Sequence, residues 1–318
     1  VDGLSVPWSV QFLPDREMLV TERPGRVWLS SGQTHTVPTV TERGEGGLMG
    51  AALHPAFTTN RFLYLYYSTT VAGTLENRIE RFVLEADGSL TPDRIILQGI
   101  PAARYHDGGR IAFGPDGLLY ATVGDAGVPA EAQNPESLHG TILRMTPDGE
   151  VPPDNPFNSL VYSYGHRNAQ GLAWDTAGQL WSTEHGRSGL RSGFDELNRI
   201  EAGGNYGWPE SQGDQVAPGT IAPVLHSGPS TTWAPASLAY HEGNLYFAGL
   251  RGETLYEAKL RSGTIDQWRE HLVGEYGRLR EVTVGPEGAL YVSTSNRDGR
   301  GTPADADDRI IRVMPERL

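Results

Sequence analysis

A histidine and an aspartate stand where proton transfer could be carried out. The segment YHDGGRIAFGPDGLLYATVGD holds two short apolar stretches joined by a Pro-Asp-Gly turn, with His106 before the first and Asp125 after the second. If the stretches form an antiparallel hairpin, both residues emerge at the same end. Histidine is a suitable general base near neutral pH, and a carboxylate beside it fixes its tautomer. A loop histidine and a turn-forming aspartate are the alternative interpretation.

Arginines recur near the ends of predicted strands. Arg167 and Asn168 adjoin in SYGHRNAQG, a pair that can bind a carboxylate and a carbonyl together. Arg278 and Arg280 in GRLREV share one face of an extended segment, and Arg251 lies at a loop end. The set indicates a ligand with several carboxylates or phosphates, although each arginine alone also fits a solvated surface charge.

One segment is rich in potential oxygen ligands. GFDELNRIEAGGNYGWP combines Asp195 and Glu196 with a Gly-Gly-Asn-Tyr-Gly turn. Carboxylates and irregular backbone are what Ca²⁺ prefers. The segment has no EF-hand spacing, so the pattern alone leaves a calcium site undecided.

The elements that must position these residues follow a repeated phrase, in which an apolar residue, a turn and an apolar strand recur six times. The repeated strands begin at Met18, Leu63, Leu119, Leu180, Leu245 and Leu290. Roughly 50 residues per copy matches a four-stranded propeller blade. We therefore predict an all-β, six-bladed β-propeller with four-stranded antiparallel blades, formed by residues 1–318 as one domain. A β-sandwich is the alternative, but sandwiches do not repeat one phrase six times.

Long insertions separate the middle copies, notably residues 126–139, 184–209 and 210–232. Loops of that size on a compact scaffold usually carry function. They predict a site at one face of the ring, over the mouth of the central channel.

Composition excludes several classes of partner. The formal net charge of −13 argues against nucleic acid, and no apolar run approaches the length of a membrane span. Cysteine is absent, so the fold needs no disulfide. Because the sequence starts at Val1 rather than Met, we expect that a signal segment was removed and that the protein is periplasmic or secreted.

Six segments together resemble one family, the soluble pyrroloquinoline-quinone (PQQ)-dependent aldose sugar dehydrogenases, which are related to soluble glucose dehydrogenase. They are EGGLMGAALHPAF, the segment YHDGGRIAFGPDGLLYATVGD that contains His106, GHRNAQG, DELNRIEAGGNYGWP, WAPASLAYHEG and GRLREV, in the order of the family. The resemblance extends over nearly the whole chain.

The resemblance implies a role for each matching residue. His106 matches the catalytic base, and Asp125 matches the carboxylate that partners it. The implied PQQ contacts are Arg167, Asn168, Thr232, Arg251, Arg278 and Arg280, with Glu45 where some members have Gln. Glu196 and the backbone of Tyr206 match a Ca²⁺ site.

The implied reaction is oxidation of an aldose at C1 to the lactone, with hydride passing to the quinone and electrons then to an external acceptor. Two alternatives are a metal-dependent lactonase or hydrolase on a six-bladed propeller, and a non-catalytic propeller that binds glycans or proteins. The second leaves the His106–Asp125 pair and the arginine set unexplained.

Overall fold

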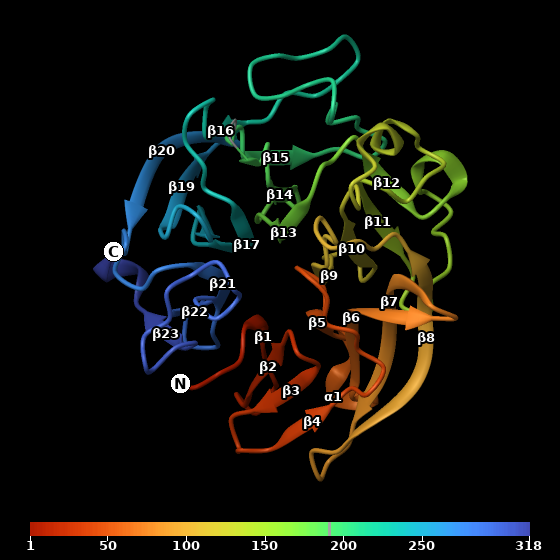
Figure 1. Cartoon of the computed structure of the whole chain (residues 1–318), viewed down its shortest axis with the longest axis vertical. Helices are drawn as coiled ribbons and strands as arrows, with labels where there is room; N and C mark the ends of the chain where they lie inside the picture. Colours follow the sequence, from red (N-terminus) through yellow and green to blue (C-terminus); the bar gives the residue numbers. More distant parts are fainter. Residues whose placement is uncertain (190–191) are drawn as a thin grey trace.

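The computed structural model describes residues 1–189 and 192–318, and its sheets are arranged as a ring (Figure 1). Within each sheet the strands follow one another antiparallel in chain order. At most junctions between neighbouring blades, the first strands contact one another. The predicted all-β, six-bladed propeller is confirmed.

The blades have these strands. The first contains β1 (Pro7–Phe12), β2 (Met18–Glu22), β3 (Arg26–Leu29) and β4 (Thr34–Thr36). The second contains β5 (Leu48–Leu53), β6 (Phe62–Val71), β7 (Thr74–Leu84) and β8 (Leu90–Ile100). The third contains β9 (Ile111–Phe113), β10 (Leu119–Val123), β11 (Thr141–Met145) and β12 (Val161–Tyr164).

The other half of the ring follows the same plan. The fourth blade contains β13 (Ala169–Trp174), β14 (Leu180–Glu184), β15 (Glu196–Ile200) and β16 (Leu225–His226). The fifth contains β17 (Pro235–His241), β18 (Asn244–Gly249), β19 (Leu255–Arg261) and β20 (Thr264–His271). The sixth contains β21 (Leu279–Val284), β22 (Leu290–Thr294) and β23 (Ile310–Val313).

The helices in the described residues are short and lie outside the sheets. They are α1 (Phe57–Asn60) and the 3₁₀ turns η1 (Pro129–Gln133), η2 (Pro156–Asn158) and η4 (Pro315–Arg317). Within the described ranges, no helix combines the length and apolar character that crossing a membrane requires.

The turn between the first two strands explains the repeated phrase. Gly117 and Gly288 have φ of +75° and +81°, a conformation that glycine adopts without steric cost. In the first blade Arg16 takes the equivalent place with φ +72°, so that copy tolerates a strained residue.

The sixth blade differs from the prediction of four strands, because it has three. The chain start runs beside its outer strand instead: Leu4 and Asp308 exchange backbone hydrogen bonds of 2.9 and 3.1 Å, and Ile310 N donates to Val1 O at 2.8 Å. This contact joins the two ends of the chain and closes the ring.

The core lies between neighbouring blades. Leu19 and Leu29 of the first blade pack with Leu63 and Leu65 of the second, and all four are essentially fully buried. Each such side chain contributes roughly 1.5–3 kcal/mol of stability. Because each blade is packed on both faces, the loops at its ends are held on a rigid frame.

Candidate active site

The predicted site residues gather at one end of the ring because of how each blade begins. In an antiparallel pair, the start of the first strand and the end of the second lie at the same edge. His106 and Arg167 precede the first strands β9 and β13, whereas Asp125 and Arg251 follow the second strands β10 and β18. The hairpin argument therefore holds for more than one blade.

The first strands are irregular close to this edge. In five blades the pairing of the first strand with the second shifts near its start, at Pro7/Ser9, Leu48/Ala51, Ala169/Gly171, Pro235/Leu238 and Leu279/Val282. Such bulges bend a strand and redirect its side chains, and they are frequent beside active sites. Here they lie directly next to the loops that carry the site.

The predicted His106–Asp125 pair is formed. Nδ1 of His106 lies 2.7 Å from Oδ1 of Asp125, and the carboxylate is fully buried. Asp125 also accepts hydrogen bonds from Gly127 N at 2.8 Å and Trp208 Nε1 at 2.9 Å. Burial alone would raise the pKa of Asp125, but the hydrogen bonds, led by that from His106, outweigh it and lower the pKa.

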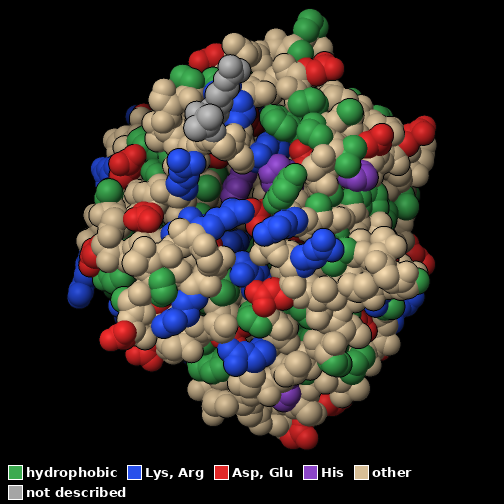
Figure 2. Space-filling model, in the orientation of Figure 1, with side chains coloured by type: hydrophobic (Ala, Val, Ile, Leu, Met, Phe, Trp, Pro, Cys, Tyr) green, Lys and Arg blue, Asp and Glu red, His purple; other side chains and the backbone are tan. Residues whose placement is uncertain are grey.

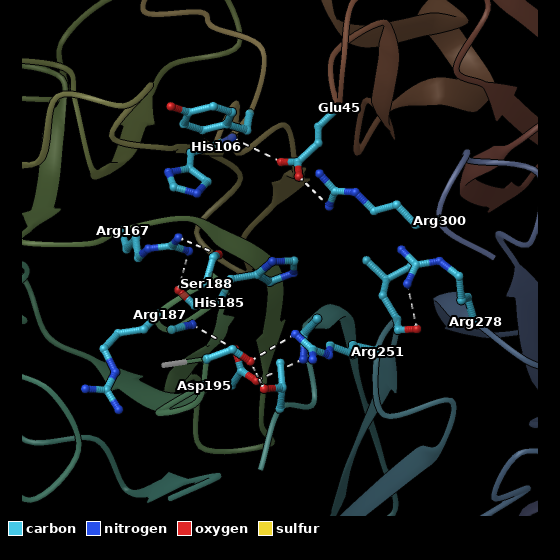
Figure 3. Close-up of a pocket in the computed structure, with 16 residues that line it drawn as sticks. Glu45, His106, Arg167, His185, Arg187, Ser188, Asp195, Arg251, Arg278 and Arg300 are labelled. Atoms are coloured by element: carbon cyan, nitrogen blue, oxygen red, sulfur yellow. Dashed lines mark hydrogen bonds and ion pairs between the residues drawn. The ribbon is translucent and has the colours of Figure 1, made fainter. Parts of the chain in front are cut away.

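His106 lies at the wall of a cavity of about 520 Å³ in which arginines outnumber carboxylates. The cationic residues of its lining are Arg167, Arg187, Arg251, Arg278 and Arg300 (Figure 3). In the space-filling view, Lys and Arg side chains gather around the hollow near the centre of this face (Figure 2). A chain with net charge −13 therefore concentrates positive charge at one opening.

Arg278 and Arg280 lie together, as predicted, but differ in what they contact. Both are buried and line a second space of about 340 Å³ next to the first. Arg278 is engaged by Asp298 and by the carbonyl of Leu250. Within the described chain, the Arg280 guanidinium makes one hydrogen bond, from Nε to Ser295 Oγ at 3.3 Å, and its Nη2 is 4.0 Å from Asp298.

Arg167 and Asn168 take different positions. The Arg167 guanidinium lines the cavity, where it donates to Ser188 Oγ at 2.8 Å and lies 5.3 Å from the Trp208 ring centre. Asn168 is fully buried behind it and accepts a hydrogen bond from Gly108 N at 3.0 Å. Asn168 thus supports the loop of His106, and a direct cofactor contact from it stays a prediction.

Thr232 and Arg251 line the cavity on the fifth blade. The hydroxyl of Thr232 is hydrogen-bonded to that of Ser192, and Arg251 Nη1 donates to the same Ser192 Oγ at 3.1 Å. Ser192 belongs to the long loop of the fourth blade. The predicted contacts therefore meet on an insertion, as the loop lengths suggested.

Glu45 reaches the same cavity from the second blade. Its Oε2 accepts a hydrogen bond from the backbone N of His106 at 3.1 Å, and its Oε1 lies 2.7 Å from Arg300 Nη1. Burial tends to raise the pKa of Glu45, but Arg300 and the His106 N–H lower it overall. Glu45 is therefore ionised, and its charge is balanced by Arg300.

Glu196 and Tyr206 line a narrow space that adjoins the large cavity. Glu184 and Gln212 line the same narrow space. Glu196 accepts from Asn198 Nδ2 at 3.2 Å and more weakly from Gly213 N at 3.4 Å. Burial, and then the neighbouring Glu184, raise the pKa of Glu196 to about 8. No group of three or more His, Cys, Asp or Glu side chains arranged for a metal occurs in residues 1–189 and 192–318.

Comparison with known proteins identifies the chain. Residues 4–311 match the model of the glucose/sorbosone dehydrogenase family. The chain belongs to this family. The resemblance noted from the sequence is confirmed, and with it the enzyme class: the chain is a sugar dehydrogenase, an oxidoreductase, rather than a hydrolase or a binding propeller.

Several proteins similar to this sugar dehydrogenase have names that state an activity or a cofactor. It is 32% identical to aldose sugar dehydrogenase YliI of Escherichia coli, over 94% of this chain and 89% of that protein. The PQQ-bound form of aldose sugar dehydrogenase from Streptomyces coelicolor is 42% identical, covers 99% of this chain and 95% of its own, and superposes with a TM-score of 0.91. A glucose dehydrogenase described as a putative oxidoreductase from Thermus thermophilus is 46% identical, with coverages of 99% and 98% and a TM-score of 0.92.

Sequence reasoning missed several cavity residues of this dehydrogenase, among them His185, Asp298 and Arg300. His185 directly follows the second strand β14, as Asp125 and Arg251 follow theirs at slightly greater distance. That shared position in the repeat is the pattern that could have revealed it. Burial, with a smaller effect of Arg167 and Arg280, lowers the pKa of His185 to about 3, so it stays neutral.

Proposed function

We propose that this dehydrogenase oxidises aldoses at C1 to lactones with PQQ as cofactor and His106 as general base. The observation that carries the proposal is the His106–Asp125 pair at the wall of an arginine-lined cavity. The PQQ-bound Streptomyces relative supports the choice of cofactor.

The residues present fit a flat, polycarboxylate cofactor. Arg280 is buried, and burial lowers its pKa to about 10. A buried cation with few partners is costly unless an anion pairs with it. Arg280 and Arg278 would hold carboxylates on one side, and Arg167, Arg251 and Thr232 would hold the rest, with Asn168 behind and Glu45 beside them. When bound, PQQ supplies a quinone that accepts hydride from C1 of the sugar.

The chain itself supplies the proton transfer. Because Asp125 is ionised and lies against Nδ1, it keeps the proton of the neutral imidazole on that nitrogen. Nε2 of His106 is then the basic nitrogen, and it takes the proton of the anomeric hydroxyl as hydride leaves. Trp208 and Gly127 hold Asp125 in turn.

We further propose that Ca²⁺ binds at Glu196 and the backbone of Tyr206. A buried carboxylate with a raised pKa beside a second carboxylate is stabilised by a cation. Asn198 adds a buried Oδ1 that has no hydrogen-bond partner in the described residues. An external acceptor would reoxidise the cofactor, and a periplasmic or secreted location would suit such an enzyme.

Reconstitution tests the function. Purified protein with PQQ and Ca²⁺ should show an absorbance change on cofactor binding and should reduce a redox dye when aldoses are added. Omitting PQQ should abolish dye reduction. A protein that binds no PQQ, or binds it and oxidises none of a broad panel of aldoses, would contradict the proposal.

A further inference from the structure

Glu45 joins three blades at the edge of the cavity. It precedes β5 of the second blade and contacts His106, which precedes β9 of the third, and Arg300, which follows β22 of the sixth. Figure 3 shows the carboxylate between the two partners. The contact with His106 is made to its peptide N–H, so it does not compete with the imidazole.

His106 has a backbone conformation that needs support. Its φ is +63°, in the left-handed region that is unfavourable for residues other than glycine. Such strain persists only where several contacts define the geometry. Here Ala126 N donates to His106 O at 3.2 Å, Asp125 holds the ring, and Glu45 accepts from the peptide N.

The loop of Glu45 is itself fitted to that of His106. Glu45 N donates to Arg104 O at 3.0 Å, so the two loops exchange hydrogen bonds in both directions. Gly44 beside it has φ +67°, and a Cβ there would lie 2.0 Å from the same carbonyl oxygen. The close approach leaves Glu45 little freedom to turn away from His106.

Arg300 stabilises the Glu45 carboxylate in its position. An ionised carboxylate beside a cavity built for anions is disfavoured unless a cation pairs with it. Arg300 provides that pair while its own side chain remains 62% exposed. Removing Arg300 should therefore disturb the position of Glu45 more than it lowers the stability of the fold.

We propose that Glu45 is a positioning residue that fixes the peptide of His106, and that Arg300 acts through Glu45 by pairing with it. The inference rests on the proposed role of His106 as the base. It gives Glu45 a task within the chain that is separate from cofactor contact. Displacement of a catalytic group by about 1 Å can lower the rate roughly 10²-fold. A contact that holds His106 in place therefore supports turnover.

The test uses the variants Glu45→Ala, Glu45→Gln and Arg300→Ala, with Arg261→Ala as a matched control. Arg261 lies at the end of β19, is exposed like Arg300, and has no ion-pair partner among the described residues, so its loss removes the same charge away from Glu45 and from the cavity. Three quantities are measured: kcat and KM for an aldose at saturating PQQ, PQQ affinity by absorbance titration, and hydrogen exchange of the His106 amide in the cofactor-free protein.

Glu45→Ala should lower kcat by about 10²-fold with little change in KM. Its His106 amide should exchange about tenfold faster, as expected for loss of one hydrogen bond. Glu45→Gln keeps an oxygen acceptor and should retain most of kcat. Arg300→Ala should show a smaller fall in kcat and no added effect in combination with Glu45→Ala. Arg261→Ala should match the parent in kcat and amide exchange.

The proposal is overturned if Glu45→Ala keeps the parent kcat and amide exchange, or if its only defect is PQQ affinity. It is also overturned if Arg300→Ala and Arg261→Ala behave alike, a comparison that remains informative should Glu45→Ala fail to fold. If the parent protein oxidises no aldose, the proposed function fails, whereas amide exchange still reports whether Glu45 holds His106.

Discussion

Asp298 accepts two hydrogen bonds from Arg278 on one carboxylate oxygen, from Nε at 3.0 Å and from Nη2 at 2.7 Å. The third arm of the same guanidinium donates to Leu250 O at 3.1 Å. Most donors of Arg278 are thus engaged by the protein, whereas Arg280 keeps most of its donors for a ligand. Two arginines that look equivalent in the sequence are unequal in the structure.

This inequality predicts different effects of removing each arginine. Arg280→Ala should weaken PQQ binding by about 1.5–3 kcal/mol, the worth of a charge-assisted hydrogen bond. Arg278→Ala should weaken it less and should lower the melting temperature more, because it leaves Asp298 buried without its main partner. Equilibrium titration with PQQ and thermal melts of the cofactor-free variants measure both. Equal affinities for the two variants would contradict the inequality, and a parent-like affinity of Arg280→Ala would place Arg280 outside the cofactor site.

Removing the base should separate turnover from binding. His106→Gln should lower kcat by about 10²–10⁴-fold, the usual contribution of a positioned base, while PQQ binding persists. Asp125→Asn should cost less, since the imidazole remains. Steady-state kinetics at saturating PQQ, with binding measured in parallel, provide the check. A His106→Gln variant that binds PQQ and keeps the parent rate would exclude the mechanism.

The lowered pKa of Asp125 predicts an acid-dependent loss of stability. A carboxyl group with a depressed folded pKa stabilises the fold above its unfolded pKa of about 3.9, and the gain disappears as pH falls through the folded value. Asp125→Asn should therefore melt below the parent at pH 7, and the difference should shrink under acid conditions below pH 4. A difference that is the same at pH 7 and pH 3 would show that the charge of Asp125 contributes nothing to stability.

Glu196 should show the opposite dependence on pH. Its pKa is raised from 4.5 to about 8, so the metal-free protein should lose stability as pH rises between these values and Glu196 is forced to ionise. Ca²⁺ should reverse the loss by binding the ionised form. We expect chelator to lower the melting temperature more at pH 9 than at pH 6. Glu196→Gln serves as the control, because its melting should respond little to chelator at either pH.

The concentration of arginine at the cavity predicts salt-sensitive cofactor capture. An anionic ligand that approaches a cationic opening is steered by the field, and salt screens it over about 10 Å at 0.1 M. The PQQ association rate, measured by stopped flow, should fall as NaCl is raised, whereas the dissociation rate should change less. An association rate independent of salt would indicate that the arginines bind the cofactor without guiding it.

The sequence by itself largely determined the fold and which residues form the site. Each copy of the repeat carries its own turn and strand pattern, so local chemistry is enough to count six blades. The antiparallel hairpin then brings His106 to Asp125 in any propeller, because the start of one strand and the end of the next share an edge.

What the sequence left undecided depends on contacts between blades. Nothing local to Glu45 indicates that Arg300, four blades further along the chain, would neutralise it, or that Asp298 would engage Arg278 and leave Arg280 open. The absence of a fourth strand from the last blade and the burial of Asn168 behind the cavity also depend on contacts between blades. Repeat patterns fix backbone within a blade, but the direction of a loop side chain is set by whichever partner the closed ring brings within hydrogen-bond distance.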